Sequence, residues 1–269
     1  MRKVIRDCQY WYEVYGNGEA VVLLHGFTGS TKTWKYFVEK YQSEFKIIVI
    51  DLPGHGRTIT PSPISMEQCC YDLHAILTDA GVNSFHLVGY SMGGRTALTY
   101  AMYFQEQLKS LILESSSPGL ATEEERIGRM ANDENLAIKL EANGVKAFID
   151  FWEKIPLFET QKSLPEDVVA EVRNERLSQT KEGLALSLRG MGTGSQPNWW
   201  GKLSSVTKPV LLLVGEKDNK FIQLNKKMHE SLSNSKLKVV ENAGHAIHVE
   251  RPAFFGKIVE EFILANRKV

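Results

Sequence analysis

Gly89-Tyr90-Ser91-Met92-Gly93 is the stretch of sequence that decides the fold. It follows an apolar run from Phe85 to Val88 and precedes a helical pattern, rich in Ala and Leu, that begins at Gly94. A G-x-S-x-G sequence between a strand and a helix is typical of a nucleophile elbow, because two glycines let the turn close tightly and leave the serine hydroxyl exposed. An ordinary Gly-Ser turn is the alternative, and the flanking strand and helix favour the elbow.

Short apolar runs that end in turn residues recur on both sides of this motif. Their length and β-branched content are typical of strands buried on both faces, as in a parallel sheet. They are 20–24, 47–50, 85–88, 111–113, 210–214 and 237–240. Helical patterns such as 66–80 lie between them, which predicts an α/β fold with a mostly parallel, doubly wound sheet. The alternating stretch Tyr10 to Tyr15 is expected to be an antiparallel edge strand.

The alternation of strands and helices breaks between about Ser115 and Ser205. Thr122 and Glu125 have the spacing of a capping box at a helix start. A second helix is expected to end before Pro156, and a third to run from Pro165 to Leu177. We therefore expect a helical cap, residues 115–205, inserted before the last strands of a core formed by residues 1–114 and 206–269.

Composition excludes several classes of function. The 269 residues include 32 Lys and Arg and 32 Asp and Glu, so no global field favours binding to nucleic acid or an anionic membrane. No apolar run approaches the roughly 20 residues that span a bilayer, so membrane insertion is not expected. The N-terminus lacks the apolar region of a signal peptide, so we expect a cytoplasmic location. The three cysteines, Cys8, Cys69 and Cys70, have no metal-ligand spacing, so no metal site is expected. Self-association stays open.

A serine at an elbow needs an imidazole and an acid. His245 follows the last predicted strand and Asp218 follows the strand before it, so both should lie at the same sheet edge as Ser91. His248 is the nearest rival to His245, and Asp51 and Glu216 are weaker alternatives to Asp218. The chain order Ser91, Asp218, His245 is that of α/β-hydrolases.

Two backbone N–H groups are candidates for an oxyanion hole. One belongs to Met92, after the serine, and the other to Phe27, in the His25-Gly26-Phe27-Thr28-Gly29 loop after an early strand. The G-x-S-x-G stretch lacks the G-x-G-x-x-G pattern of a dinucleotide site, so no cofactor is expected.

The chain resembles the α/β-hydrolase superfamily over essentially its full length. Within it, the sequence is similar to the 2-succinyl-6-hydroxy-2,4-cyclohexadiene-1-carboxylate synthases (MenH) of menaquinone biosynthesis. The resemblance is carried by Gly89 to Arg95, by Ser117-Pro118-Gly119-Leu120 with Arg126 and Arg129 after it, by Phe151-Trp152-Glu153-x-x-Pro156-Leu157-Phe158 and by Gly192-x-Gly194-x-Gln196-Pro197. It implies a cofactor-independent lyase that removes a ring proton and expels pyruvate from a small-molecule substrate with several carboxylates.

The same resemblance implies that Tyr90, Arg95, Arg129, Trp152 and Arg173 bind the substrate. Arg95 also has a physical argument, because a cation in the first turn of a helix is disfavoured by the helix dipole unless an anion offsets it. Arg126 and Arg176 lie three residues from Arg129 and Arg173 on the same helix faces and stay open as alternatives.

Two other classes of function stay open. A carboxylesterase or carbon-carbon bond hydrolase would use the same triad through an acyl-enzyme or a bound water, and an apolar pocket without arginines would favour it. A non-catalytic binding protein of hydrolase fold is the other, and the intact triad argues against it.

Overall fold

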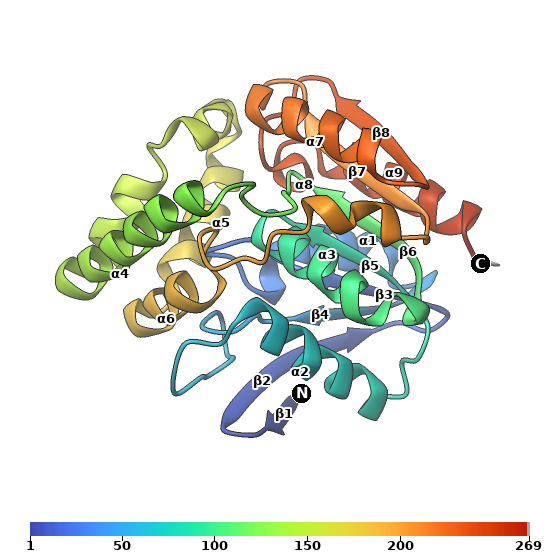
Figure 1. Ribbon diagram of the computed structural model, residues 1–269, viewed down its shortest axis with the longest axis horizontal. Coiled ribbons are helices and arrows are strands. Elements are labelled where there is room, and N and C mark those ends of the chain that lie inside the picture. Colours follow the sequence, from blue (N-terminus) through green and yellow to red (C-terminus); the bar gives the residue numbers. More distant parts are fainter. Residues whose placement is uncertain (268–269) are drawn as a thin grey trace.

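A sheet of eight strands forms the centre of the molecule in a computed structural model that describes residues 1–267. The strand order is β1-β2-β4-β3-β5-β6-β7-β8, and all neighbours from β4 to β8 pair in parallel (Figure 1). The strands are β1 (Arg2–Ile5), β2 (Cys8–Tyr15), β3 (Glu19–Leu24), β4 (Phe45–Ile50), β5 (Phe85–Tyr90), β6 (Leu108–Glu114), β7 (Val210–Gly215) and β8 (Ser235–Val240). This confirms the predicted α/β class with a mostly parallel sheet.

The antiparallel end of the sheet differs from the sequence-based prediction in one respect. Strand β2 pairs antiparallel to β4, as expected, but β1 pairs with its other side and is the true edge. Four residues with only Val4 and Ile5 apolar are too short to show a strand pattern.

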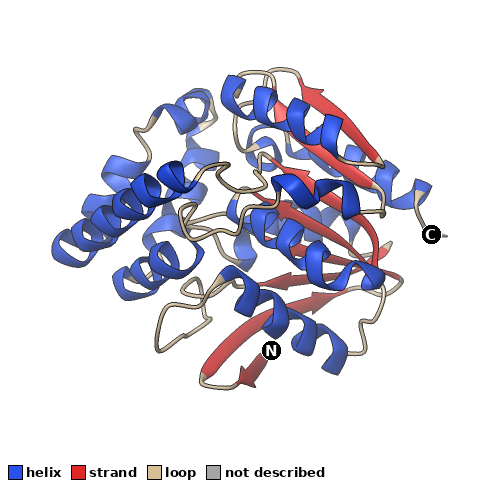
Figure 2. Ribbon diagram, in the orientation of Figure 1, coloured by secondary structure: helices blue, strands red, loops and turns tan. Residues whose placement is uncertain are grey.

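Helices cover both faces of the sheet (Figure 2). Alternate residues of β3 show why, since Val22 and Leu24 pack into one buried cluster with α2 and α3, whereas Val21 and Leu23 pack into another with α1 and α9. The helices of this core are α1 (Lys35–Tyr41), α2 (Met66–Asp79), α3 (Met92–Phe104), α7 (Asn219–Ser231), α8 (Ile247–Glu250) and α9 (Pro252–Ala265), with short 3-10 helices η1 (Thr31–Trp34) and η2 (Gln105–Gln107). The 3-10 helix η4 (Trp200–Ser205) comes from the end of the segment expected in the cap and packs on this core through Leu203.

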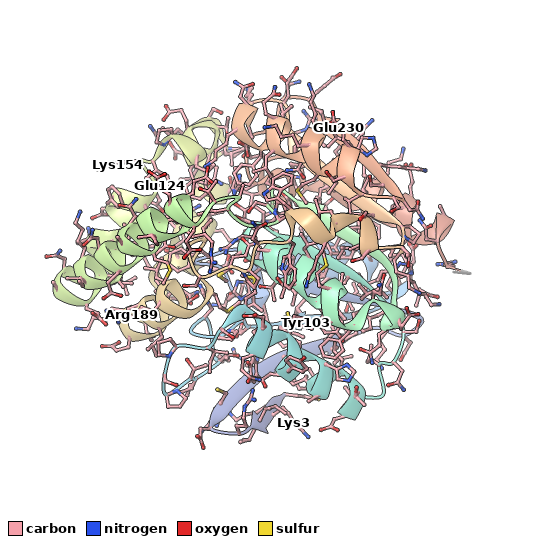
Figure 3. All side chains as sticks on the ribbon, viewed as in Figure 1. Lys3, Tyr103, Glu124, Lys154, Arg189 and Glu230 are labelled. Carbon is pink, nitrogen blue, oxygen red and sulfur yellow. The ribbon has the colours of Figure 1, made fainter. Side chains whose placement is uncertain are left out.

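The remaining helices project from one end of the sheet as a cap (Figure 1). They are α4 (Glu123–Trp152), the 3-10 segment η3 (Pro156–Ser163), α5 (Glu166–Leu177) and α6 (Lys181–Met191). Figure 3 labels Glu124, Lys154 and Arg189 on this part of the molecule. Helices α4 and α6 bury a small core of their own around Leu140 and Leu184, so the cap is held together by its own apolar contacts.

The cap helices differ in detail from those expected. The capping box at Thr122 and Glu125 is present, but α4 continues to Trp152 through a break at Gly144, whose φ is +77°. Helix α6 was not expected at all. Among residues 1–267, no helix has the combination of length and apolar character needed to cross a bilayer.

Candidate active site

Ser91 stands in a strained turn between β5 and α3. Its φ is +50°, a backbone conformation that non-glycine residues rarely adopt. A Cβ on Gly93 would lie 2.1 Å from the Leu24 carbonyl oxygen, and one on Gly89 would lie 2.3 Å from the Gly93 oxygen. Only glycine therefore fits on either side of the serine, as the elbow motif predicts.

Ser91, His245 and Asp218 form a continuous hydrogen-bonded chain. The Ser91 Oγ lies 3.1 Å from His245 Nε2, and His245 Nδ1 lies 2.7 Å from Asp218 Oδ2. Since a carboxylate only accepts, His245 donates its Nδ1–H to Asp218 and its Nε2 accepts from the serine hydroxyl. His245 and Asp218 are both buried. The geometry is that of a serine activated by an oriented base.

The rival side chains are bound elsewhere. His248 donates its Nδ1–H to the buried Glu114 carboxylate, and Glu216 accepts from the Asn242 N–H. Asp51 accepts from the backbone N–H groups of Thr31 and Arg57. None of the three contacts Ser91 or His245.

The loop that carries His245 is held by a second carboxylate. Glu250 accepts hydrogen bonds from the N–H groups of Gly244, at 2.7 Å, and Ala246, at 3.3 Å. These two residues flank His245, so the imidazole is fixed by its backbone as well as by Asp218.

Residues 26–31, which we call the oxyanion loop, lie beside the elbow. The Thr28 N–H donates to His55 Nε2 and the Gly29 N–H donates to the Gly26 oxygen, whereas within the described chain the Phe27 N–H has no acceptor. Met92 is the first residue of α3, where N–H groups have no partner inside the helix. Both groups are free to stabilise an anionic oxygen near Ser91.

A cavity of about 190 Å³ opens in front of Ser91 and His245. Its lining includes Phe27, Met92, Arg95, Arg129, Trp152 and Lys220. Lys220 was missed by sequence reasoning, although its position two residues after Asp218 at the same sheet edge was a usable signal.

Arg95 is a buried cation in this cavity. One terminal guanidinium nitrogen donates to the Met191 oxygen at 3.0 Å. Burial, helped by the charge of Arg129, lowers the pKa of Arg95 to about 10, so the side chain is still charged at neutral pH. An anion bound beside it would restore the interactions that water no longer supplies.

Arg129 lines the cavity and Arg126 does not. The Arg129 Nε donates to Asp133 at 2.7 Å, which orients the guanidinium, while Arg126 turns outward to Glu123. Of these two positions, Arg129 is therefore the one that a ligand in the cavity can reach.

Arg173 is a correction to the sequence-based expectation. Its guanidinium binds Asp150 and Glu153 within the cap and does not line the cavity. Arg176, one turn later, is buried instead, donates to Gln161 at 3.0 Å and lies 4.7 Å above the Phe158 ring. The rotation of α5 about its axis, relative to the core, decides which arginine points inward. The local sequence carries no signal for this rotation.

A second hollow of about 260 Å³ adjoins the first and shares Phe27 with it. Tyr90 and Arg176 line this second hollow, and the Tyr90 ring lies between His245 and His248, at 5.4 and 4.4 Å. Trp152 lines the first hollow and stacks on Phe148 of the cap core, so it is both a lining and a packing residue.

No cluster of three or more His, Cys, Asp or Glu residues within 1–267 is arranged to hold a metal ion. The three cysteines are buried and unpaired.

Comparison with known proteins agrees with this geometry. The model of the alpha/beta hydrolase fold family matches residues 19–252, so the chain belongs to that family. A solved thermophilic esterase from Thermogutta terrifontis has 27% identity and a TM-score of 0.85, over 96% of this chain and 94% of its own.

Two further relatives define the branch of the family. A putative 2-succinyl-6-hydroxy-2,4-cyclohexadiene-1-carboxylate synthase of Bacillus subtilis (strain 168) is 44% identical over 91% of this chain and 90% of its own length. The structure of MenH from S. aureus has a TM-score of 0.91 and 37% identity, over 96% of this chain and 99% of that one. The chain belongs to the 2-succinyl-6-hydroxy-2,4-cyclohexadiene-1-carboxylate synthase family.

Proposed function

We propose that this protein eliminates pyruvate from 2-succinyl-5-enolpyruvyl-6-hydroxy-3-cyclohexene-1-carboxylate to give 2-succinyl-6-hydroxy-2,4-cyclohexadiene-1-carboxylate, a step of menaquinone biosynthesis. One observation carries the proposal beyond the family name. The Ser91 and His245 pair opens into a cavity that also holds the guanidinium groups of Arg95 and Arg129. A site for neutral esters has no need of two such cations.

The substrate is expected to occupy both hollows. It carries three carboxylates, and neither 190 nor 260 Å³ reaches the roughly 300 Å³ that small-molecule sites usually have. Arg95 and Arg129 would bind carboxylates in the first hollow, and Arg176 with the Tyr90 hydroxyl would bind one in the second. Trp152 and Phe27 would form the apolar walls around the ring.

The reaction follows from the hydrogen-bonded chain. His245 takes the hydroxyl proton of Ser91, and the serine oxygen removes the ring proton next to the succinyl carbonyl. The electrons of the broken C–H bond form an enolate-like carbonyl, which the N–H groups of Phe27 and Met92 stabilise. These electrons then form the C2–C3 double bond, the existing C3–C4 double bond moves to C4–C5, and the bond from C5 to the enolpyruvyl oxygen breaks. The leaving group is the enolate of pyruvate, which becomes pyruvate when its CH2 carbon takes a proton, and the proton held by His245 restores the balance.

We also propose that residues 1–114 and 206–269 form the catalytic core and residues 115–205 the cap. The triad and both oxyanion donors come from the core, whereas Arg129, Trp152 and Arg176 come from the cap. In this division the core performs the proton transfer, and the cap supplies Arg129 and Arg176 to bind carboxylates together with Arg95 and Tyr90 of the core.

Pyruvate release from the enolpyruvyl substrate tests the proposal. Ser91→Ala should keep the circular dichroism of the wild type and lower turnover about 10³-fold or more, the scale observed when one member of a cooperating triad is removed. His245→Ala should be as damaging. His248→Ala, which changes the neighbouring histidine outside the triad, should retain most of the activity. A folded Ser91→Ala protein with wild-type pyruvate release would exclude the mechanism.

A serine esterase is the second candidate, favoured by the triad itself and by the likeness to the Thermogutta terrifontis esterase. A short-chain nitrophenyl ester measured in parallel distinguishes the two. The esterase assignment requires the ester to be the better substrate of the wild type.

A further inference from the structure

We infer that Glu175 and Gln179, on the cap, are positioning residues that hold the oxyanion loop in place for the Phe27 N–H. The inference rests on the proposed function, because it takes the Phe27 N–H as a donor to the developing enolate. It extends that function by connecting substrate recognition in the cap to the oxyanion hole in the core.

Gln179 makes the more direct of the two connections. Its Nε2 donates to the Gly29 oxygen at 3.1 Å, and its Oε1 accepts from the Gly56 N–H at 2.9 Å. The side chain is buried, with 6% exposed, so water does not compete for these bonds. One amide therefore joins the oxyanion loop to the loop after β4.

Glu175 makes the second connection, one turn earlier. Its Oε1 accepts from the Ser30 hydroxyl at 2.6 Å and from the Thr33 hydroxyl at 2.8 Å. Ser30 is the next-to-last residue of the oxyanion loop and the N-cap of η1, so this contact holds the loop where η1 begins. Burial raises the pKa of the Glu175 carboxyl, and the two hydroxyl donors oppose that rise.

The core holds only part of the loop. Its Thr28 N–H is bound by His55 and its Gly29 N–H by Gly26, but within the described chain the Gly29 carbonyl is bound only by Gln179. Phe27 lies two residues before that carbonyl. The core binds the loop again at its end, where the Thr31 N–H donates to Asp51 at 2.6 Å. Loss of the cap contact therefore frees the Gly29 carbonyl, between these core contacts, and shifts the Phe27 N–H.

Arg176 lies between these two residues in the same turn of chain. Its guanidinium lines the second hollow, where a carboxylate of the proposed substrate binds. A ligand held by Arg176 thus steadies the segment that fixes the oxyanion loop, and binding in the cap favours the catalytic arrangement in the core.

Gln179→Ala tests the inference. It should lower kcat for pyruvate release about 10-fold or more and leave KM within about threefold, because the lost contacts position a transition-state donor and do not touch the substrate. Glu175→Ala should act in the same way, and Glu175→Gln should restore most of kcat, since its amide oxygen still accepts from both hydroxyls.

Glu134→Gln is the matched control. Glu134 of α4 accepts from Arg189 of α6 at 2.9 Å, so it also helps to hold the cap together, but outside both hollows and the oxyanion loop. This variant should keep wild-type kcat and KM. An equal loss of kcat in Glu134→Gln and Gln179→Ala would overturn the inference, because general loosening of the cap would then explain both.

Hydrogen exchange of the backbone amides separates this inference from the proposed function. Peptides that cover residues 26–33 should exchange faster in Gln179→Ala than in wild type or Glu134→Gln. Unchanged exchange in Gln179→Ala overturns the coupling. If the wild type released no pyruvate, the proposed function would fail, and the exchange comparison would still decide whether the cap holds the loop.

Discussion

Two buried histidines next to the oxyanion loop are each restricted to one neutral form. His25 Nδ1 lies 2.8 Å from the Gly26 oxygen, and its Nε2 accepts from the Leu52 N–H at 2.9 Å. His55 has the same pattern, with Nδ1 3.1 Å from the Pro53 oxygen and Nε2 accepting from the Thr28 N–H. Since a carbonyl only accepts and an amide N–H only donates, Nδ1 carries the proton and Nε2 has none. A second proton would break one bond to the backbone in each case.

The pH dependence of stability follows from these two residues. Burial lowers the pKa of His25 to about 4 and that of His55 to about 3, compared with about 6.5 in an unfolded chain. Below pH 6.5 the unfolded state binds more protons, so the free energy of unfolding falls as the pH falls. Each imidazole should remove roughly 1.5 kcal/mol between pH 6.5 and pH 5.

Urea unfolding at several pH values measures this effect. His55→Gln removes one titrating group and keeps an acceptor for the Thr28 N–H, so its curve should be flatter than that of the wild type. His229→Gln, at an exposed position on α7, should leave the wild-type slope unchanged. Parallel curves for all three proteins would show that His55 is not responsible.

A second prediction at the residue scale concerns the three arginines that line the two hollows. Replacing Arg95, Arg129 or Arg176 with Ala should lower kcat/KM for the enolpyruvyl substrate about 10- to 100-fold, because each charge-assisted hydrogen bond contributes about 1.5 to 3 kcal/mol. Hydrolysis of an uncharged nitrophenyl ester should change only a few fold.

Arg173→Ala is the control for this series. Arg173 lies three residues from Arg176 on the same helix but lines neither hollow, and it pairs with Asp150 and with Glu153, to which Arg176 also donates at 3.4 Å. It should change kcat/KM by less than about threefold. A large loss in Arg173→Ala with little loss in Arg176→Ala would return Arg173 to the site.

These residues also show how much of the candidate site could be predicted from the sequence. Ser91, Asp218 and His245 could be placed together because each follows a strand of the parallel part of the sheet, and parallel strands end at one edge of a sheet. The choice between Arg173 and Arg176 depends on how α5 rolls against the core, and the roles of Glu175 and Gln179 depend on contacts about 150 residues away along the chain. Such contacts leave no periodic or spacing signal.

At the scale of elements, α4 contains two glycines in opposite situations. Gly128 has helical geometry, whereas Gly144 has φ +77° and ψ 171°, a region that only glycine occupies readily. A Cβ at either position would meet no atom within 4 Å, so packing does not contribute to the comparison.

Alanine at these two positions should therefore change stability in opposite directions. Gly128→Ala should stabilise the protein by about 0.5 to 1 kcal/mol through helix propensity, and Gly144→Ala should destabilise it by about 1 to 3 kcal/mol through backbone strain. Urea unfolding followed by circular dichroism at 222 nm measures both. A stabilising Gly144→Ala would mean that α4 is continuous at this point in solution.

The elements that sequence patterns missed have physical reasons in common. Strand β1 has four residues, fewer than an alternating pattern needs to be recognised. Helix α6 buries Leu184 and Leu188 against α4, so its place depends on a partner helix formed about 40 residues earlier. Strands β3 to β7 were predictable because burial on both faces makes them largely apolar, whereas β8 is a largely exposed edge strand that is continuously apolar only at Val239 and Val240.

At the scale of the whole molecule, the catalytic chain of hydrogen bonds closes between distant parts of the sequence. Ser91 and His245 are separated by 154 residues, and most of the interval forms the cap. Strands β5 to β8 lie side by side in the order in which they occur along the chain. The two strands that precede Asp218 and His245 are therefore the last to be synthesised.

This order has a consequence during synthesis on the ribosome. At roughly 5 to 20 residues per second, translation needs about 8 to 30 s to proceed from Ser91 to His245. Within that time, from the synthesis of β6 to that of β7, β6 has a neighbour on one side only, and its outer row of N–H and C=O groups has no partner strand. A nascent chain that stalls within the cap therefore carries the serine and the oxyanion loop without a base, beside an open strand edge that another nascent chain can pair with.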